Sequence, residues 1–224
     1  MIYELFRWIF LITAYLPQLL FFKRKTYYEQ GAPRAPWKRG GALVITNHFS
    51  FVDYFLSMFI VAPRKLNVVC SEYAYQNKFF AWGMRFAGGI EANRITRSMS
   101  FVRESARLIR KGKLVQIFPE GHNTPDGKIH EFKRSYLLIA YRANAPIIPI
   151  VTDGVYHLFK RTRVIVGKPI LLSDYIDTTP AVLPREDRER VNAIIHAKVL
   201  ELREELERIK QAEKSPRERK KNHG

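Results

Sequence analysis

The sequence is poor in cysteine and in acidic residues. Its one cysteine, Cys70, excludes a disulfide within the chain and is compatible with a reducing compartment. Only 21 Asp and Glu residues stand against 38 Lys and Arg among 224 residues, a formal net charge of +17. That charge predicts an anionic partner, either nucleic acid, a phosphate-bearing substrate or an anionic membrane surface. The sequence lacks a stacking motif, a zinc knuckle and a recognition-helix signature, which argues against nucleic acid.

A long hydrophobic run is also missing. The most apolar stretch is the N-terminus, but its uncharged part, Trp8 to Phe22, has only 15 residues and contains Pro17. A spanning helix needs about 20 apolar residues, and proline breaks or kinks a helix. We therefore expect residues 1–25 to form two short apolar helical pieces in the membrane interface, followed by cations for anionic head groups at 23–25. A helix buried in the protein core is the alternative, because it would also be apolar nearly all round.

Short apolar runs alternate with helical patterns along the rest of the chain. The expected strands are 41–46, 66–70, 113–118, 146–151 and 163–167, and the expected helices are 50–60, 76–87, 98–112, 132–145 and 186–211. This alternation predicts an α/β fold with a largely parallel central sheet flanked by helices. We expect a membrane-contact segment at 1–25, a single α/β domain at 26–212 and a disordered basic tail at 213–224.

Three apolar runs end at residues with useful chemistry. GALVIT leads into His48, GGIEANR ends at Arg94, and KLVQIF leads into a turn that contains Glu120 and Gly121. Such residues meet at the carboxyl ends of parallel strands, where the sites of these sheets collect. Histidine can take a proton from a hydroxyl, and arginine can hold a phosphate through its planar fork of donors. The glycine permits a close approach between backbone and ligand.

The pair His48 and Asp53 has two interpretations. Ser50 to Asp53 fits a capping box, in which the carboxylate bonds back to the start of a helix, and His48 is then a satisfied core residue. Alternatively, a helix that starts at Ser50 points the carboxylate of Asp53 back toward the loop that holds His48. The carboxylate would then fix which imidazole nitrogen acts as a base. The pair would be two members of a catalytic triad without its nucleophilic serine, so the nucleophile would be a hydroxyl of the substrate.

These residues resemble the glycerolipid acyltransferases of the lysophosphatidic-acid acyltransferase type. His48 and Asp53 fit the H-x4-D block of that family, and FPEG at 118–121 follows at the family's distance, which makes the resemblance specific. The stretches 89–94, 126–135 and 145–154 fit further blocks, so the resemblance covers most of the folded part of the chain.

The resemblance implies transfer of a fatty acyl group from acyl-carrier protein or acyl-CoA to the free hydroxyl of a lysophospholipid, most simply 1-acyl-glycerol-3-phosphate giving phosphatidic acid. It implies that His48 is the base and Asp53 its orienter. It implies no cofactor and no metal. It also implies a monotopic enzyme of phospholipid biosynthesis on the cytoplasmic face of an anionic membrane, with an amphipathic N-terminal helical pair in the bilayer.

The substrate-binding residues implied by the resemblance are Phe118, Pro119, Glu120, Gly121 and Arg94, with Arg94, Glu120 and Gly121 at the glycerol-phosphate end. Lys133 either meets the phosphate or is a solvated lysine at a helix start.

One departure concerns the acceptor. The family usually has Ser or Thr after FPEG, whereas this chain has His122, so a hydroxyl donor is replaced by an imidazole. The blocks do not separate 1-acyl-glycerol-3-phosphate from glycerol-3-phosphate, other lysophospholipids or lyso-ornithine lipids. Two other classes stay open: a membrane-bound metal hydrolase with ligands at positions 48, 53, 120 and 122, and a non-catalytic protein that binds anionic membranes.

Overall fold

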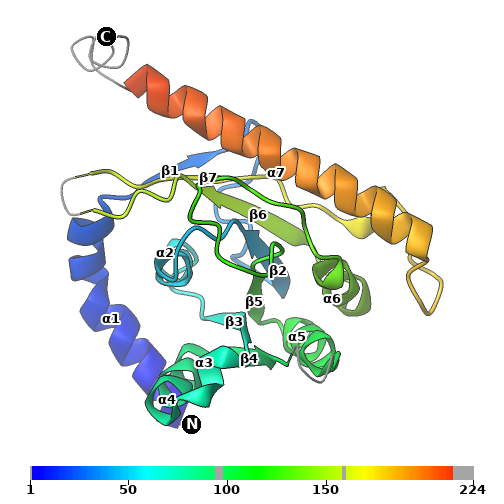
Figure 1. Ribbon diagram of the computed structural model, residues 1–224, viewed down its shortest axis with the longest axis horizontal. Helices are drawn as coiled ribbons and strands as arrows, with labels where there is room; N and C mark the ends of the chain where they lie inside the picture. Colours follow the sequence, from blue (N-terminus) through cyan, green and yellow to red (C-terminus); the bar gives the residue numbers. More distant parts are fainter. Residues whose placement is uncertain (1, 94–97, 158–159, 214–224) are drawn as a thin grey trace.

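The computed structural model describes residues 2–93, 98–157 and 160–213. They form a seven-stranded sheet with helices on both faces (Figure 1). The strands are β1 (Lys25–Tyr28), β2 (Ala42–Thr46), β3 (Leu66–Ser71), β4 (Gly89–Ala92), β5 (Leu114–Ile117), β6 (Ile147–Thr152) and β7 (Arg163–Val166). The helices are α1 (Ile2–Phe22), α2 (Val52–Ile60), α3 (Tyr73–Gln76), α4 (Lys78–Ala87), α5 (Ser100–Arg110), α6 (Ser135–Ala143) and α7 (Arg185–Glu213), with a 3-10 turn, η1, at Leu172–Asp174.

The strand order is β1-β7-β6-β2-β5-β3-β4. The run from β6 to β4 is parallel, β7 is antiparallel to β6, and β1 is parallel to β7. Every residue of the central strand β2 is buried, as expected for a parallel strand that is covered on both faces. The predicted α/β fold with a largely parallel central sheet is therefore confirmed.

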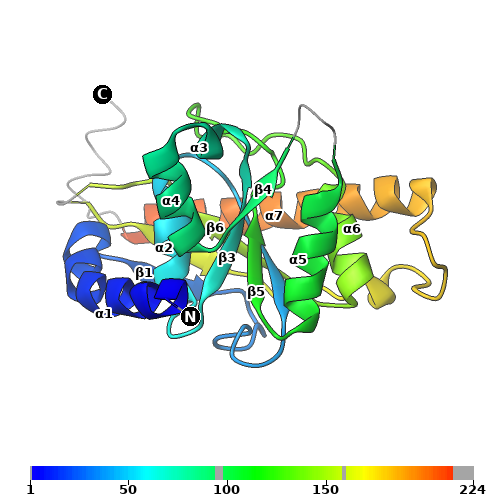
Figure 2. The ribbon, with the colours of Figure 1, turned by 90° about the horizontal axis from the view of Figure 1, so that it is seen from below.

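The two faces of the sheet form separate cores. Leu43 and Ile45 of β2 belong to the core that α5, α6 and α7 cover. Ala42 and Val44, which point the other way, belong to the core under α1, α2 and α4. Figures 1 and 2 show these two groups of helices on opposite sides of the sheet. The carboxyl ends of the parallel strands lie between these two groups of helices and are available to form a site.

Helix α1 differs from the predicted pair of helical pieces. It is one continuous helix with Pro17 inside it, and Figure 2 shows its last part turned away from the direction of the first. Leu11, Gln18 and Phe22 are buried, and α1 packs on α2 and α4. This packing holds the helix together although proline donates no backbone hydrogen bond. Within the described ranges, no helix has both the length and the apolar character needed to cross a membrane.

One of the three cations that follow α1, Lys25, forms an ion pair within the fold. Lys25 begins β1, an edge strand that the sequence analysis did not predict, and its ammonium bonds the carboxylate of Glu213 at the end of α7. Tyr27 and Arg163 donate to the same carboxylate. Burial would raise the pKa of Glu213, but these three donors outweigh it and lower the pKa to about 2. Lys25 therefore ties β1 to α7. Of the predicted disordered tail, Glu213 is helical and residues 214–224 lie outside the described residues.

Candidate active site

The candidate site is built at the carboxyl ends of the parallel strands, as predicted. β2 leads to Asn47 and His48, and β5 leads into the FPEG turn. The side chain of Asn47 accepts a hydrogen bond from the N–H of Thr152 at 2.9 Å and donates to its carbonyl at 3.2 Å. These two bonds join the ends of β2 and β6, and they fix the backbone directly before His48.

His48 and Asp53 lie together, and the carboxylate of Asp53 reaches both the start of α2 and the ring of His48. Nδ1 of His48 is 3.2 Å from Oδ2 of Asp53, whose side chain is only 1% exposed. The same oxygen accepts the N–H of Ser50 at 2.7 Å, as a capping box predicts, but α2 begins at Val52, two residues after the predicted start. Because a carboxylate only accepts, Nδ1 carries the proton, and Nε2 is the nitrogen with a lone pair for base chemistry.

Tyr156 is a third member of this group that the sequence analysis missed. Its hydroxyl donates to Oδ1 of Asp53. Burial and the neighbouring charge of Asp53 both raise the pKa of Tyr156, so the phenol keeps its proton and remains a donor. Tyr156 lies in the segment after β6, and its ring meets the ring of Phe22, at the end of α1, edge-on at 5.9 Å between centroids. The residue is 103 positions from Asp53 and belongs to no motif, so only the fold reveals it.

The loop that follows β5 holds His48 on several sides. Oε1 of Glu120 accepts the backbone N–H of His48 at 2.9 Å, and the N–H and hydroxyl of Thr124 both donate to the His48 carbonyl, at 2.7 and 3.0 Å. The imidazole stacks on the ring of Phe118 with 3.8 Å between centroids. Both the main chain and the ring of His48 are therefore positioned by the loop.

Glu120 and Gly121 have different functions in that loop. The second oxygen of Glu120 accepts the N–H of His130 at 2.9 Å, so the fully buried carboxylate binds two backbone amides. This placement does not fit a direct contact of Glu120 with the glycerol-phosphate end and instead makes it a brace for the loop. Gly121 has φ +72°, which L side chains rarely adopt, and a Cβ there would lie 2.8 Å from Nζ of Lys133, so a side chain would be strained and would also displace the lysine.

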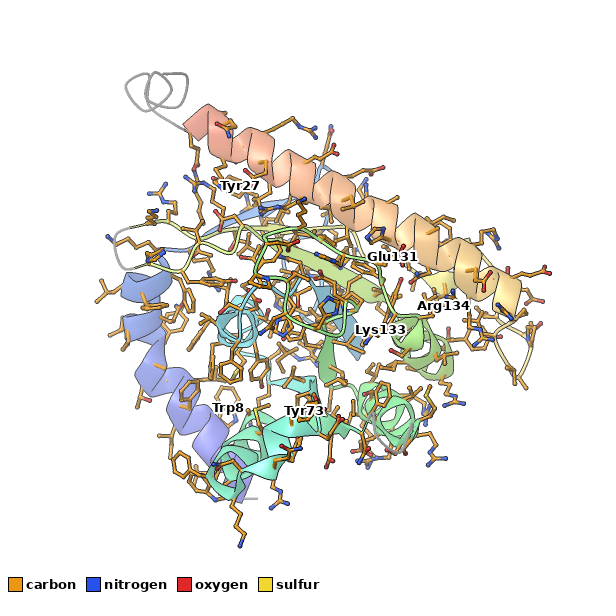
Figure 3. All side chains as sticks on the ribbon, viewed as in Figure 1. Trp8, Tyr27, Tyr73, Glu131, Lys133 and Arg134 are labelled. Carbon is orange, nitrogen blue, oxygen red and sulfur yellow. The ribbon has the colours of Figure 1, made fainter. Side chains whose placement is uncertain are left out.

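A cavity of about 750 Å³ opens in front of His48. Phe118, Pro119, Gly121 and Lys133 line it, as substrate-binding residues should, together with His122. Figure 3 labels Lys133, ahead of α6, and Tyr73, which lines the cavity from α3. Asp53 and Glu120 lie behind the wall of this cavity. Arg94, the other predicted substrate-binding residue, lies outside the described residues.

A second cavity of about 370 Å³ adjoins the first. It lies among α1, α2 and α4, and its walls are apolar, with Phe10, Phe55, Met58, Trp82 and Gly83 among the lining residues. Both cavities are lined by Phe51, Tyr54 and Met84. Phe51 therefore lies on the wall between the two cavities.

Comparison with known proteins identifies the family. Residues 23–153, more than half of the chain, match the family model described as Acyltransferase. The chain belongs to the acyltransferase family. The described residues around His48 up to Asp153 fall within the matched range, whereas Tyr156 and all of α1 lie outside it.

Relatives of this acyltransferase carry a common name. The 1-acyl-sn-glycerol-3-phosphate acyltransferase of Bacillus subtilis is 22% identical over 191 residues, which cover 83% of this chain and 90% of the relative. The enzyme of that name from Cocos nucifera is 25% identical over 161 residues, 70% of this chain and 52% of its own length. This chain thus spans about half of the Cocos nucifera relative. The crystal structure of PlsC, the 1-acyl-sn-glycerophosphate acyltransferase of Thermotoga maritima, has a TM-score of 0.57 at 24% identity, over 81% of this chain and 73% of that one, and shares the fold.

The larger cavity also holds a thiol. Cys70 lines the larger cavity, but burial raises the pKa of its thiol to about 11. Its sulfur also lies 3.5 Å from the hydroxyl of Tyr75. A thiol that stays protonated at neutral pH is a poor nucleophile.

Proposed function

We propose that this acyltransferase moves a fatty acyl group from a thioester of acyl-carrier protein or coenzyme A to the free hydroxyl of 1-acyl-glycerol-3-phosphate, giving phosphatidic acid. The observation that carries the proposal is that His48, with Asp53 bonded behind it, lies on the wall of a cavity that Lys133 also lines. The curated relatives named 1-acyl-sn-glycerol-3-phosphate acyltransferases support the choice of acceptor.

The reaction follows from the orientation of His48. Nε2 takes the proton of the acceptor hydroxyl as its oxygen attacks the thioester carbonyl. The resulting imidazolium is stabilised by the carboxylate of Asp53, which Tyr156 and Ser50 hold in place. The tetrahedral intermediate collapses, the carbon–sulfur bond breaks, and the imidazolium returns the proton to the leaving thiolate. The products are the new ester and the free thiol of the carrier.

The two adjoining cavities suit the two ends of the substrates. The phosphate of the acceptor meets Lys133 and the turn at Gly121, with Phe118 and Pro119 along the same wall. The family pattern adds Arg94 to this end. The apolar cavity among α1, α2 and α4 takes an acyl chain, because its walls are almost entirely aromatic and aliphatic.

We further propose that α1 holds the enzyme on one leaflet, as a monotopic protein on the cytoplasmic face. Ile12, Leu16 and Leu20 are 71%, 70% and 69% exposed on the helix face turned away from the domain. Trp8, labelled in Figure 3, is partly exposed, and the ammonium of Lys65 lies 5.1 Å from its ring centre, an aromatic–cation pair suited to a head-group region. An apolar surface of this extent marks an interaction site.

The test of the reaction is an assay of the purified full chain in detergent. Both thioester donors are offered with 1-acyl-glycerol-3-phosphate, glycerol-3-phosphate, other lysophospholipids and a lyso-ornithine lipid. The proposal predicts the highest kcat/KM for 1-acyl-glycerol-3-phosphate. A higher value for another acceptor would replace the acceptor but keep the reaction, whereas no transfer to any of them would leave a non-catalytic membrane-binding protein.

The test of the membrane surface is flotation with anionic vesicles. Ile12→Asp combined with Leu16→Asp places two charges on the exposed face of α1 without touching its buried residues, and this variant should lose vesicle binding in high salt. Val182→Asp is the matched control, because Val182 is equally exposed and far along the chain from α1. Salt-resistant binding by the double variant would refute the assignment of α1 as the anchor.

A further inference from the structure

His122 is the position at which this chain departs from the family pattern, and the fold brings it into the site. It follows Gly121 directly, its side chain is exposed, and it lines the same cavity as His48 and Lys133. Nδ1 of His122 lies 3.0 Å from the carbonyl oxygen of Glu120. A carbonyl only accepts, so Nδ1 carries a proton and the bond fixes the tautomer of the neutral ring.

With Nδ1 protonated, the other nitrogen, Nε2, is an acceptor in the neutral ring and a donor in the protonated ring. In the neutral ring Nε2 presents a lone pair, which a phosphate oxygen repels. In the protonated ring Nε2 presents an N–H and a positive charge, which a phosphate oxygen accepts. A serine or threonine hydroxyl at this position would donate in either case, because it does not titrate in this range. The histidine therefore converts a contact that is independent of pH into one that takes up a proton.

The ammonium of Lys133 lies close to His122. The aliphatic stem and ammonium of Lys133 pass over Gly121, with Nζ 2.8 Å from the place of a Cβ on that glycine. The glycine is the residue that joins Glu120 to His122, so the lysine and the imidazole line adjacent parts of one wall. The carboxylate of Glu120 is turned away, toward the amides of His48 and His130. It therefore does not compete with an anion at this wall.

We propose that His122 is a ligand for a phosphate monoester in the cavity, and that it makes binding of that monoester depend on pH. The proposal rests on the proposed acyl transfer and deepens it, because it names the phosphate as the feature of the substrate that this residue selects. Two substrates offer such a group: the acceptor 1-acyl-glycerol-3-phosphate, and a coenzyme A thioester through its 3′-phosphate.

Several other groups face His122, and each bears on its charge. The ring of His130 is 5.7 Å away, and Nε2 of His130 is 2.9 Å from Oδ2 of Asp126. Among the described residues that line the cavity, the other titratable groups are His48, Tyr54, Cys70, Tyr73 and Lys133. Nearby cations such as Lys133 oppose a further positive charge on the wall, whereas a bound phosphate favours it. Proton uptake is therefore linked to binding of the phosphate.

The kinetic test compares the purified full chain with His122→Ser and His157→Asn from pH 5.5 to 8. In the wild type, KM for 1-acyl-glycerol-3-phosphate should rise by about 10-fold across this range, as expected for a charge-assisted hydrogen bond that is lost. In His122→Ser the rise should be less than about 2-fold. His157→Asn, which replaces an exposed histidine that does not line the cavity, is the matched control and should behave as the wild type. The phosphate itself titrates near pH 6, equally for all three proteins, so the ratio between them isolates His122.

Two further arms separate the sources of the phosphate. A lysophospholipid whose phosphate is a diester should show the same KM in wild type and His122→Ser if the acceptor is the source. If the pH effect follows the thioester of coenzyme A and vanishes with that of dephospho-coenzyme A, the source is the donor. Identical pH profiles and identical preferences in wild type and His122→Ser would overturn the proposal.

A binding readout keeps the inference separate from the proposed reaction. The titration of His122 can be followed by the NMR signal of its ring Cε1–H in the full chain, with glycerol 3-phosphate as the probe and glycerol as its control. The midpoint should rise by about one pH unit with glycerol 3-phosphate, the linked counterpart of a 10-fold change in affinity, and should not move with glycerol. An unmoved midpoint refutes the role of His122 even if acyl transfer is found. A raised midpoint supports it even if acyl transfer is not.

Discussion

Replacing Asp53 by asparagine removes one charge from the site and leaves the shape of the side chain almost unchanged. One carboxylate oxygen accepts from Ser50 and His48, and the other accepts from Tyr156. An asparagine keeps its carbonyl toward Ser50 and His48, because the reverse orientation would place its NH2 group against the N–H of Ser50. The NH2 group then donates to the hydroxyl of Tyr156, which can accept. The tautomer of His48 is therefore preserved.

The predicted fall in kcat comes only from the loss of the negative charge at position 53. An imidazolium and a carboxylate about 4 Å apart interact by about 4 kcal/mol at an effective dielectric constant of 20. Part of this is recovered by the amide dipole, so we expect kcat to fall by about 10²- to 10³-fold. This is less than the roughly 10⁴-fold loss that follows when the analogous substitution forces the wrong tautomer in a serine-protease triad. The helix start keeps its hydrogen bond, so the stability loss should be about 1 kcal/mol or less.

The assay is steady-state acyl transfer by wild type and Asp53→Asn with saturating donor and acceptor, alongside thermal unfolding of both proteins. Adding Tyr156→Phe leaves the new NH2 group without its acceptor, so the double variant should lose more stability than the sum of the single ones. A loss of kcat under about 3-fold in a folded Asp53→Asn protein would refute the reasoning, because the carboxylate would then not stabilise an imidazolium.

Three further predictions follow from other contacts. Tyr156→Phe removes one donor from Asp53, and kcat should fall by about 10-fold with the acceptor KM unchanged, whereas a merely structural residue would change both. Gly83→Leu fills open space in the apolar cavity, so turnover of long-chain donors should fall by about 10-fold relative to short-chain donors. Gly83→Ala is the control. An unchanged chain preference would contradict the assignment of this cavity to the acyl chain. Glu213 has a lowered pKa, so it stabilises the fold above its unfolded pKa, and this stability is lost as pH falls from about 4.5 toward 2. Glu213→Gln should lower the free energy of unfolding by about 1–2 kcal/mol at pH 6, and a difference from wild type that persists at pH 2 would contradict the proposed bond to Arg163.

The sequence predicted most of the fold because the buried parallel strands are short apolar runs. β2 and β6 are continuous hydrophobic segments whose every residue is buried, and such runs are visible without a structure. β1 was missed because Lys25–Tyr28 is a polar and aromatic edge strand that is held by β7 and Glu213. The continuity of α1 past Pro17 was also missed, because packing against α2 and α4 overrides the local preference.

The sequence predicted the members of the site better than their functions. His48, Asp53 and the FPEG turn stand close together because each follows or begins an element whose end is fixed by the sheet. The function of Glu120 as a brace depends on the backbone amides of His48 and His130, and no side-chain pattern reports backbone direction. Tyr156 comes from a segment with no motif, and its contact with Asp53 exists only once β2 and β6 are paired.

The central claim is that His48 is the base that takes the proton of the acceptor hydroxyl. The most direct measurement is the kcat of purified His48→Ala against wild type, with 1-acyl-glycerol-3-phosphate and a saturating thioester donor. The backbone of His48 is held by Glu120 and Thr124 and its side chain is partly exposed, so the variant should unfold at nearly the wild-type temperature. The account predicts a loss of kcat of about 10²-fold or more in a folded protein. Turnover close to that of the wild type would contradict it.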